Sequence, residues 1–375
     1  MLWVDKHRPK GLDKLDYHPL LTDRLRAIAH AGDLPHLLFY GPSGAGKKTR
    51  VMALLREIFG PGVEKVKLEH RKFKTPTGRP IELTTLGSVY HIEMNPSDAG
   101  NNDRYVVQEV IKEIAQYHPV VASSGSGGLF GTAADQQSSS STSAAPVGGG
   151  KGQSFKVVFL SDCDSLTKAA QHGLRRTMER YVRTCRLILC CENLSKVIEP
   201  LRSRCLAIRV AAPSREEICG IVTTVAKREG VAFSAQAAGT VADASRRNLR
   251  RALLMAEAQR VAGDDASAVQ LPDWELFIKE LASKITTSQT PQTLLDARQY
   301  LYELLGNCIP ASTIFQTLVR YLMPSLDEEL RQQTVHWAAH YEHRLQQGDK
   351  GIYHLEAFIA KFMLLYKEYL MRMFC

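Results

Sequence analysis

The stretch that most constrains the fold is LPHLLFYGPSGAGKKTRVMALLREIFG, residues 34–60. It opens with HLLFY, a short apolar run typical of a buried strand. A glycine-rich turn follows, and apolar residues then recur at helical spacing until Gly60-Pro61 ends the pattern. A strand, a glycine-rich loop and a helix in this order predict a phosphate site, because loop N–H groups and the helix N-terminus point at the same anion.

The loop follows the nucleotide-binding pattern G-x-x-x-x-G-K-[ST] up to its last position. Lys48 stands where a serine or threonine hydroxyl would bind magnesium. Thr49 cannot take over that role directly, because one step along a helix turns the side chain by about 100°. Lys48 leaves two interpretations open: its ammonium partly replaces the charge of the missing metal, or its side chain points to solvent. The residues predicted to bind nucleotide here are Gly41, Pro42, Ser43, Gly44, Ala45, Gly46, Lys47, Lys48 and Thr49.

Three later apolar runs are also typical of buried strands, at residues 155–160, 185–191 and 206–210. Residues 168–182, between the first two runs, follow helical spacing. Strands that alternate with helices predict an α/β fold, in which a parallel sheet carries helices on both faces.

The rest of the chain is predicted to be mostly helical. A chain of 375 residues suggests two or three domains. Helical patterns follow Pro213, including one over residues 234–261, and they resume from about residue 270. In the last of them, Leu355, Phe358, Ile359, Phe362 and Tyr366 fall on one face, which indicates a core or a subunit contact. Residues 119–154 are rich in serine and glycine and are predicted to be a disordered surface insertion.

Composition narrows the class of protein. No apolar run approaches the roughly 18 to 20 residues that cross a bilayer, and residues 1–11 have no secretory apolar segment, so we expect an intracellular protein. The eight cysteines show no C-x-x-C spacing, which indicates reduced thiols and no structural metal. The net charge of +9 suits a polyanionic partner such as nucleic acid.

Four segments together resemble a known family: LWVDKHRP at 2–9, GPSGAGKKT at 41–49, AQHGLRRTMERY at 170–181 and KVIEPLRSRC at 196–205. The chain resembles the small subunits of replication factor C, the eukaryotic sliding-clamp loader of the AAA+ class. The resemblance implies an AAA+ nucleotide-binding domain over 1–210, a small helical lid domain over 211–268 and an all-α collar domain over 269–375.

The same resemblance implies a function for the whole assembly. The chain would be one subunit of a heteropentamer that uses ATP to open a ring-shaped clamp and to place it on primer–template DNA during replication and repair. The implied partners are the other large and small replication factor C subunits, the sliding clamp PCNA and primer–template DNA, with no membrane. The implied location is the nucleus, and the implied cofactor is ATP or ADP.

Two loops depart from the family's pattern in ways that affect hydrolysis. Relatives end the second strand with Asp-Glu, of which the Asp organises magnesium and the Glu polarises the attacking water. Here Ser161 and Asp162 stand at those positions, and Asp164 is the next acid along the chain. Relatives follow the strand at 185–191 with an asparagine that senses the γ-phosphate, whereas this chain has Glu192 and then Asn193.

The changed positions predict a site that binds nucleotide but hydrolyses it poorly. An ionised Glu192 near the γ-phosphate would repel ATP and remove its advantage over ADP. Magnesium is doubtful at this chain's own site, and no residue is assigned to a metal. Whether the chain is itself an enzyme stays open.

Several arginines take roles from the resemblance. Arg204, in the SRC segment, matches an arginine finger that reaches the ATP of a neighbouring subunit and stabilises charge during phosphoryl transfer. Arg250 matches a lid arginine that contacts bound nucleotide. Arg8 and Pro9 match a segment that packs beside adenine, although a basic N-terminal turn explains them equally well.

Arg175 and Arg176 share a short helix, where such residues usually form a solvated face. In a clamp loader the same helix implies contact with the DNA backbone or coupling between ATP sites.

Two other functions remain open at this point. A self-sufficient ATP-driven motor of the same fold would need magnesium ligands and a water-polarising glutamate, and the chain lacks the usual ones. A scaffold without nucleotide would leave the loop glycines and Lys47 unexplained.

Overall fold

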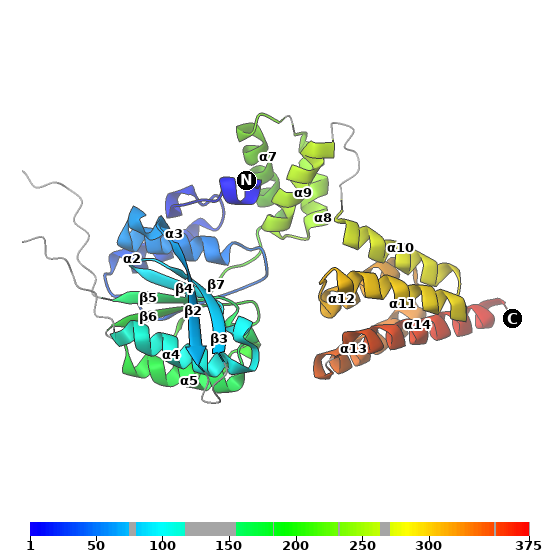
Figure 1. Ribbon diagram of the computed structural model, residues 1–375. Coiled ribbons are helices and arrows are strands. Elements are labelled where there is room, and N and C mark those ends of the chain that lie inside the picture. The colour runs from blue at the N-terminus through cyan, green and yellow to red at the C-terminus, as the bar shows by residue number, and fades with distance from the viewer. Residues whose placement is uncertain are drawn as a thin grey trace, which may run out of the picture. The chain divides into compact units, whose positions relative to one another are not determined.

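The computed structural model describes residues 1–74, 80–116, 155–182, 184–231, 233–262, 271–348 and 350–374. The chain forms two compact units, Met1–Val269 and Gln270–Cys375 (Figure 1). The predicted insertion at about 119–154 lies outside the described residues.

The first unit contains all the described strands: β1 Leu37–Tyr40, β2 Lys67–Lys74, β3 Pro80–Gly87, β4 His91–Met94, β5 Lys156–Leu160, β6 Cys185–Cys191 and β7 Leu206–Arg209. Its helices are α1 Trp3–Lys6, α2 Pro19–His30, α3 Lys47–Phe59, α4 Asp103–Gln116, α5 Lys168–Arg180, α6 Glu199–Arg202, α7 Arg215–Arg228, α8 Ala235–Ser245 and α9 Leu249–Ala262. The helices of the second unit are α10 Asp273–Thr287, α11 Pro291–Gly306, α12 Ala311–Leu322, α13 Glu328–Gln347 and α14 Gly351–Phe374.

The strands form one seven-stranded sheet in the order β2-β3-β4-β5-β6-β1-β7. The pairs β4–β5, β5–β6, β6–β1 and β1–β7 are all parallel, so the predicted α/β fold with a parallel sheet is confirmed. The antiparallel ribbon of β2 and β3 was not predicted, and it extends the sheet beyond β4.

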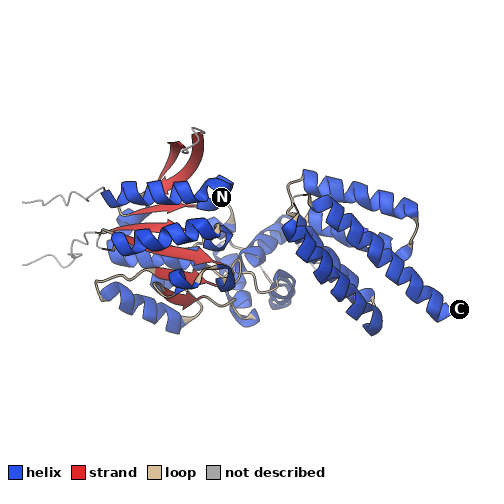
Figure 2. Cartoon of the chain, turned by 90° about the horizontal axis from the view of Figure 1, so that it is seen from below, coloured by secondary structure: helices blue, strands red, loops and turns tan. Residues whose placement is uncertain are grey.

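Helices cover both faces of this sheet (Figure 2). Successive residues of a strand point to opposite faces, so an all-apolar strand feeds two cores at once. In β1, Leu37 and Phe39 belong to the core that includes Leu55 of α3. Leu38 belongs instead to the core that includes Leu174 of α5. The continuous apolar strand runs in the sequence follow from this burial on both sides.

The register brings the carboxyl ends of the parallel strands to one edge of the sheet. Tyr40 at the end of β1 pairs with Cys191 at the end of β6. Met94 at the end of β4 pairs with Leu160 at the end of β5. The loops that follow β1, β5 and β6 therefore leave the same edge, where parallel sheets usually bind ligands.

Helices α7, α8 and α9 follow the sheet. Ser214 and Glu217 form a capping box at the start of α7, in which each side chain binds the other's backbone N–H. The helical pattern over residues 234–261 forms two helices, because Arg246 and Arg247 have left-handed φ values of 55° and 63° and separate α8 from α9.

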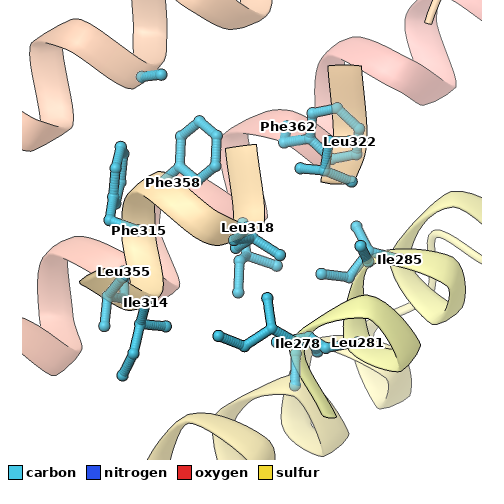
Figure 3. Packing of buried hydrophobic residues seen from close by; sticks show 14 of the residues in the cluster. Ile278, Leu281, Ile285, Ile314, Phe315, Leu318, Leu322, Leu355, Phe358 and Phe362 are labelled. Carbon is cyan, nitrogen blue, oxygen red and sulfur yellow. The ribbon is translucent and has the colours of Figure 1, made fainter. Parts of the chain in front are cut away.

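The second unit is a helical bundle with its own core (Figure 3). The predicted apolar stripe of α14 is confirmed, since Leu355, Phe358, Ile359 and Phe362 are all at most 2% exposed. Tyr366 is partly buried and packs against the same core. Among the described residues, no helix is long and apolar enough to cross a membrane.

Candidate nucleotide site

The loop between β1 and α3 has no space for a Cβ at Gly41 and Gly46. A Cβ on Gly41 would lie 2.0 Å from the carbonyl oxygen of Val210, and one on Gly46 would lie 2.1 Å from the hydroxyl of Tyr17. Gly46 also has a φ of +81°, which residues other than glycine rarely adopt. The loop is therefore held in a shape that only these glycines allow.

Gly44 lies against the start of α9. A Cβ on Gly44 would come within 1.8 Å of Oδ1 of Asn248, and φ there is +72°. The same Oδ1 accepts a hydrogen bond of 3.1 Å from the backbone N–H of Arg251, so Asn248 caps α9. The cap of α9 thus packs directly on the phosphate-type loop.

A buried arginine lies beneath the loop. Arg50 of α3 is 0% exposed, and its guanidinium donates to the carbonyl oxygen of Tyr17 at 2.7 Å and to Oγ1 of Thr22 at 3.2 Å. The Tyr17 hydroxyl in turn donates to the carbonyl oxygen of Ala45 in the loop at 2.9 Å. Because a guanidinium stays protonated, Arg50 places a fixed positive charge close under the loop.

Two lysines begin α3 and point to different partners. Lys47 donates to the carbonyl oxygens of Gly41 at 2.6 Å and Pro42 at 3.0 Å, so its ammonium lies over the loop. Lys48 forms an ion pair with Glu93 of β4, whose side chain is only 12% exposed. This partner comes from a different strand and was not predicted from the sequence.

Arg8 approaches the same place from the N-terminal segment. Its Nε donates to Oγ1 of Thr49 at 3.2 Å. Burial lowers the pKa of Arg8, while the charge of Glu93 raises it and the charge of Arg250 lowers it. Arg8 therefore lies near Arg250 of α9 as well as near α3, and Pro9 follows it as a partly buried residue. The two like charges repel each other, and an anion bound between the two guanidinium groups would offset that repulsion.

The N-terminal segment is fixed to the helices after the sheet. The backbone N–H of Trp3 donates to a carboxylate oxygen of Glu257 at 3.1 Å, and Trp3 is 2% exposed. Lys6 and His7 both contact the carboxylate of Glu229 just after α7. These contacts fix the segment that carries Arg8 to α9 and to the residue that follows α7.

The acidic loop after β5 does not converge on a metal position. The hydroxyl of Ser161 donates to the carbonyl oxygen of Met94 at 3.2 Å. Asp162 is exposed and has a left-handed φ of 48°. A carboxylate oxygen of Asp164 accepts from the backbone N–H of Asn193 at 3.3 Å, which joins this loop to the loop after β6. Among the described residues, no group of three or more His, Cys, Asp or Glu side chains could hold a metal ion.

Charges from three loops surround the end of β6. Burial raises the pKa of the Cys190 thiol to about 12, Lys47 opposes that shift, and Asp162 and Asp164 add to it. Glu192 is exposed and lies near Cys191, whose pKa it also raises. The predicted sensor position is therefore close to the predicted loop lysine, at the same edge of the sheet.

Arg204 makes its contacts away from the phosphate-type loop. It follows α6, and its guanidinium contacts the Glu179 carboxylate of α5 and the carbonyl oxygen of Pro200. Arg175 lies 3.6 Å from the same carboxylate, and Arg176 is exposed on α5. These arginines form a second group, separate in its contacts from the residues around Lys47.

Comparisons with known proteins identify the family. A family model described as the C-terminal domain of replication factor C subunit 3 matches residues 274–370, and one described as an RCF1/5-like AAA+ ATPase lid domain matches residues 220–261. Human replication factor C subunit 3 is 50% identical over 372 residues, which cover 98% of this chain and 97% of that protein. The chain belongs to the replication factor C small-subunit family. The resemblance stated from the four sequence segments is confirmed, and with it the AAA+ fold of a clamp-loader subunit.

Other replication factor C relatives match over the same length. A probable subunit 3 from Dictyostelium discoideum is 47% identical and covers 98% of this chain and 99% of that one, and a subunit 5 from Neurospora crassa is 46% identical and covers 99% of both. Among solved structures, the RuvB Holliday junction branch migration motor of Thermotoga maritima aligns with 15% identity and a TM-score of 0.46, over 85% of this chain and 91% of that one.

The site of this replication factor C chain fits the phosphates of a nucleotide, as its AAA+ fold implies. The glycine loop leaves its backbone open, and four cationic side chains gather around it: Lys47, Lys48, Arg8 and Arg250. The same residues do not fit magnesium, because an ammonium stands at the hydroxyl position and Ser161 stands at the acid position. The hydrogen-bond donors around the loop are cationic groups that bind anions.

Proposed function

We propose that the chain is a member of the clamp-loader ring that binds ATP or ADP without hydrolysing it and supplies Arg204 to the ATP site of a neighbouring subunit. The complex uses ATP to place the sliding clamp PCNA on primer–template DNA in the nucleus. The chain's own nucleotide stabilises the AAA+ domain, residues 1–210, against the lid, residues 211–268. The collar, residues 269–375, holds the ring together.

The observation that carries this proposal is the ion pair of Lys48 with Glu93. An ammonium at the metal position supplies positive charge to the phosphates without magnesium, and Glu93 keeps that ammonium in the site. Nucleotide can then bind, whereas the ion that would polarise the γ-phosphate has no hydroxyl ligand. Ser161 in place of the magnesium-organising aspartate acts in the same direction.

Hydrolysis also needs a carboxylate that polarises the attacking water. The position of that glutamate is taken by Asp162, whose side chain is one methylene shorter. Its backbone has a left-handed φ of 48°, so it leaves the strand in a turn. The self-sufficient motor remains the less favoured function, because it needs both of the groups that have changed.

Binding of ADP and ATP to the purified full chain, with magnesium and with EDTA, tests the nucleotide part of the proposal. We expect the dissociation constant to change less than about threefold when magnesium is removed. Lys47→Ala should weaken binding at least tenfold. Lys10→Ala is the matched control, since Lys10 is exposed and pairs with Glu64. Binding that collapses in EDTA would contradict the proposal and return a metal to this site.

Substitution of Arg204 in the reconstituted complex tests the part played across the subunit interface. We expect Arg204→Ala to lower ATP turnover at the neighbouring site on the order of 10³-fold, the effect typical of an arginine finger. Arg202→Ala is the control, because Arg202 is two residues away and pairs with Glu199 of its own helix. If the two variants turned over ATP equally well, Arg204 would have no such role.

A further inference from the structure

The carboxylate of Glu179 binds the side chain of Arg204 at two points. Nε of Arg204 lies 2.8 Å from Oε1 of Glu179, and a terminal nitrogen lies 2.7 Å from the same oxygen. The other terminal nitrogen donates to the carbonyl oxygen of Pro200 at 2.8 Å and lies 3.4 Å from Oγ of Ser203. Contacts on all three nitrogens determine the plane of the guanidinium as well as its place.

Glu179 is well suited to hold another side chain because it lies on a helix whose neighbouring residues are packed in the core. It lies in the last turn of α5, directly after Thr177 and Met178, which are both buried. The helix is capped at its N-terminus by Thr167, whose side chain accepts a hydrogen bond from the backbone N–H of Ala170. A side chain carried on a packed, capped helix positions its partner more accurately than one carried on a loop.

The contacts leave Arg204 able to bind something further. A guanidinium has five N–H donors; the three short contacts use three of them, and the longer bond to Oγ of Ser203 uses a fourth. One third of the Arg204 side chain is exposed, at 33%. One donor remains, on the terminal nitrogen that contacts Glu179, and it can meet a phosphate without the release of Glu179.

We propose that Glu179 is the positioning residue of Arg204: one of its carboxylate oxygens holds the guanidinium in the orientation in which it reaches the phosphate of the neighbouring subunit's nucleotide. The inference rests on the role proposed above for Arg204. An unrestrained arginine has many rotamers, and each must be given up at the interface. Glu179 restricts them before the subunits meet, so the effect appears in the rate of phosphoryl transfer and not in the binding of ATP.

Two substitutions separate positioning from simple charge. Glu179→Ala removes the oxygen, and Glu179→Gln keeps an amide oxygen that accepts the same two N–H groups. In the reconstituted complex, with the neighbouring site as the only hydrolysing one, we expect Glu179→Ala to lower kcat about tenfold while KM changes less than twofold. That loss lies between the few-fold effect of an exposed ion pair and the 10³-fold effect of a missing finger. Glu179→Gln should stay within about twofold of the unchanged complex.

Glu199→Ala is the matched control, because Glu199 is an exposed acid that pairs with Arg202 close by. Assembly of each complex, measured by size-exclusion chromatography, shows whether a variant still folds and joins the ring. A kcat for Glu179→Ala at or above that of the unchanged complex would overturn the inference, because Glu179 would then keep Arg204 away from the phosphate and would not position it. Equal losses for the Ala and Gln variants would also overturn it. If Arg204→Ala itself had no effect, the proposed function would fail regardless of Glu179.

Discussion

At the scale of single residues, the loop glycines make a prediction that separates steric clash from backbone strain. Gly46 and Gly60 both have a φ of +81°, but a Cβ on Gly46 would meet the Tyr17 hydroxyl at 2.1 Å while one on Gly60 would meet nothing within 4 Å. Gly60→Ala should cost only backbone strain, about 1–3 kcal/mol, because ψ there is −170°, a conformation that only glycine adopts readily. Gly46→Ala adds the clash to a left-handed strain of about 1–2 kcal/mol and should also weaken ADP binding tenfold or more, since Tyr17 supports the loop at Ala45. Thermal unfolding and ADP titration of both variants measure the two effects. Equal ADP affinity in the two variants would contradict the role of the clash.

Lys48 carries a second prediction at this scale. Lys48→Thr restores a magnesium-binding hydroxyl and leaves the poorly exposed Glu93 without its ammonium. In EDTA we expect ADP affinity to fall about tenfold, because a positive charge near the phosphates is lost. Magnesium should restore part of the lost ADP affinity, whereas the unchanged chain binds ADP without magnesium. Lys48→Arg keeps the charge and is the control. Calorimetric titration with and without magnesium measures these affinities. A Lys48→Thr variant whose ADP affinity in EDTA equals that of the unchanged chain would refute the prediction.

At the scale of elements, local patterns predicted four of the seven described strands and none of the long-range side-chain partners. β1, β5 and β6 were predicted because burial on both faces makes a strand apolar throughout. β7 was predicted from a similar apolar run, although only Ile208 of its four residues is buried. The break between α8 and α9 was missed, because an arginine in the left-handed region carries no signature in the sequence. Glu93 was missed for another reason: it lies 45 residues from Lys48, and only the order of the strands brings them together.

The start of β1 gives a prediction about pH. Nδ1 of His36 accepts the backbone N–H of Leu187 in β6 at 3.0 Å, and burial, with the charge of Arg186, lowers the pKa of His36 to about 4 from the ordinary 6.5. Above pH 6.5 neither state binds the proton, so the contribution to stability is complete. As pH falls from 6.5 to 4 only the unfolded chain takes up the proton, so the folded state loses stability, by up to about 3 kcal/mol.

His36→Asn keeps an acceptor for Leu187 and removes the titration. We expect its free energy of unfolding in urea to fall less steeply between pH 6.5 and pH 4 than that of the unchanged chain. His30→Asn is the control, because the His30 side chain is 68% exposed. Identical pH slopes for His36→Asn and the unchanged chain would show that His36 is not the group responsible.

At the scale of the whole molecule, the two compact units predict that damage to one core spares the function of the other. Phe358 is 1% exposed in the second unit, with its ring centroid 4.8 Å from that of Phe315 (Figure 3). Phe358→Ala leaves a cavity that costs about 3–5 kcal/mol, a large share of the stability of a unit of this size. The variant should lose its place in the reconstituted ring while the full chain still binds ADP through its first unit.

The matched control for Phe358 is Leu364→Ala on the same helix, because Leu364 is 47% exposed and its removal opens no cavity. Calorimetry should show one transition lowered in Phe358→Ala and none in Leu364→Ala. Co-purification with the other subunits then reports assembly, and ADP titration reports the site around Lys47. Loss of ADP binding together with assembly would mean that the helical unit supports the nucleotide site directly. Retained ADP binding without assembly is the outcome we expect, since the contacts around Lys47 all come from the first unit.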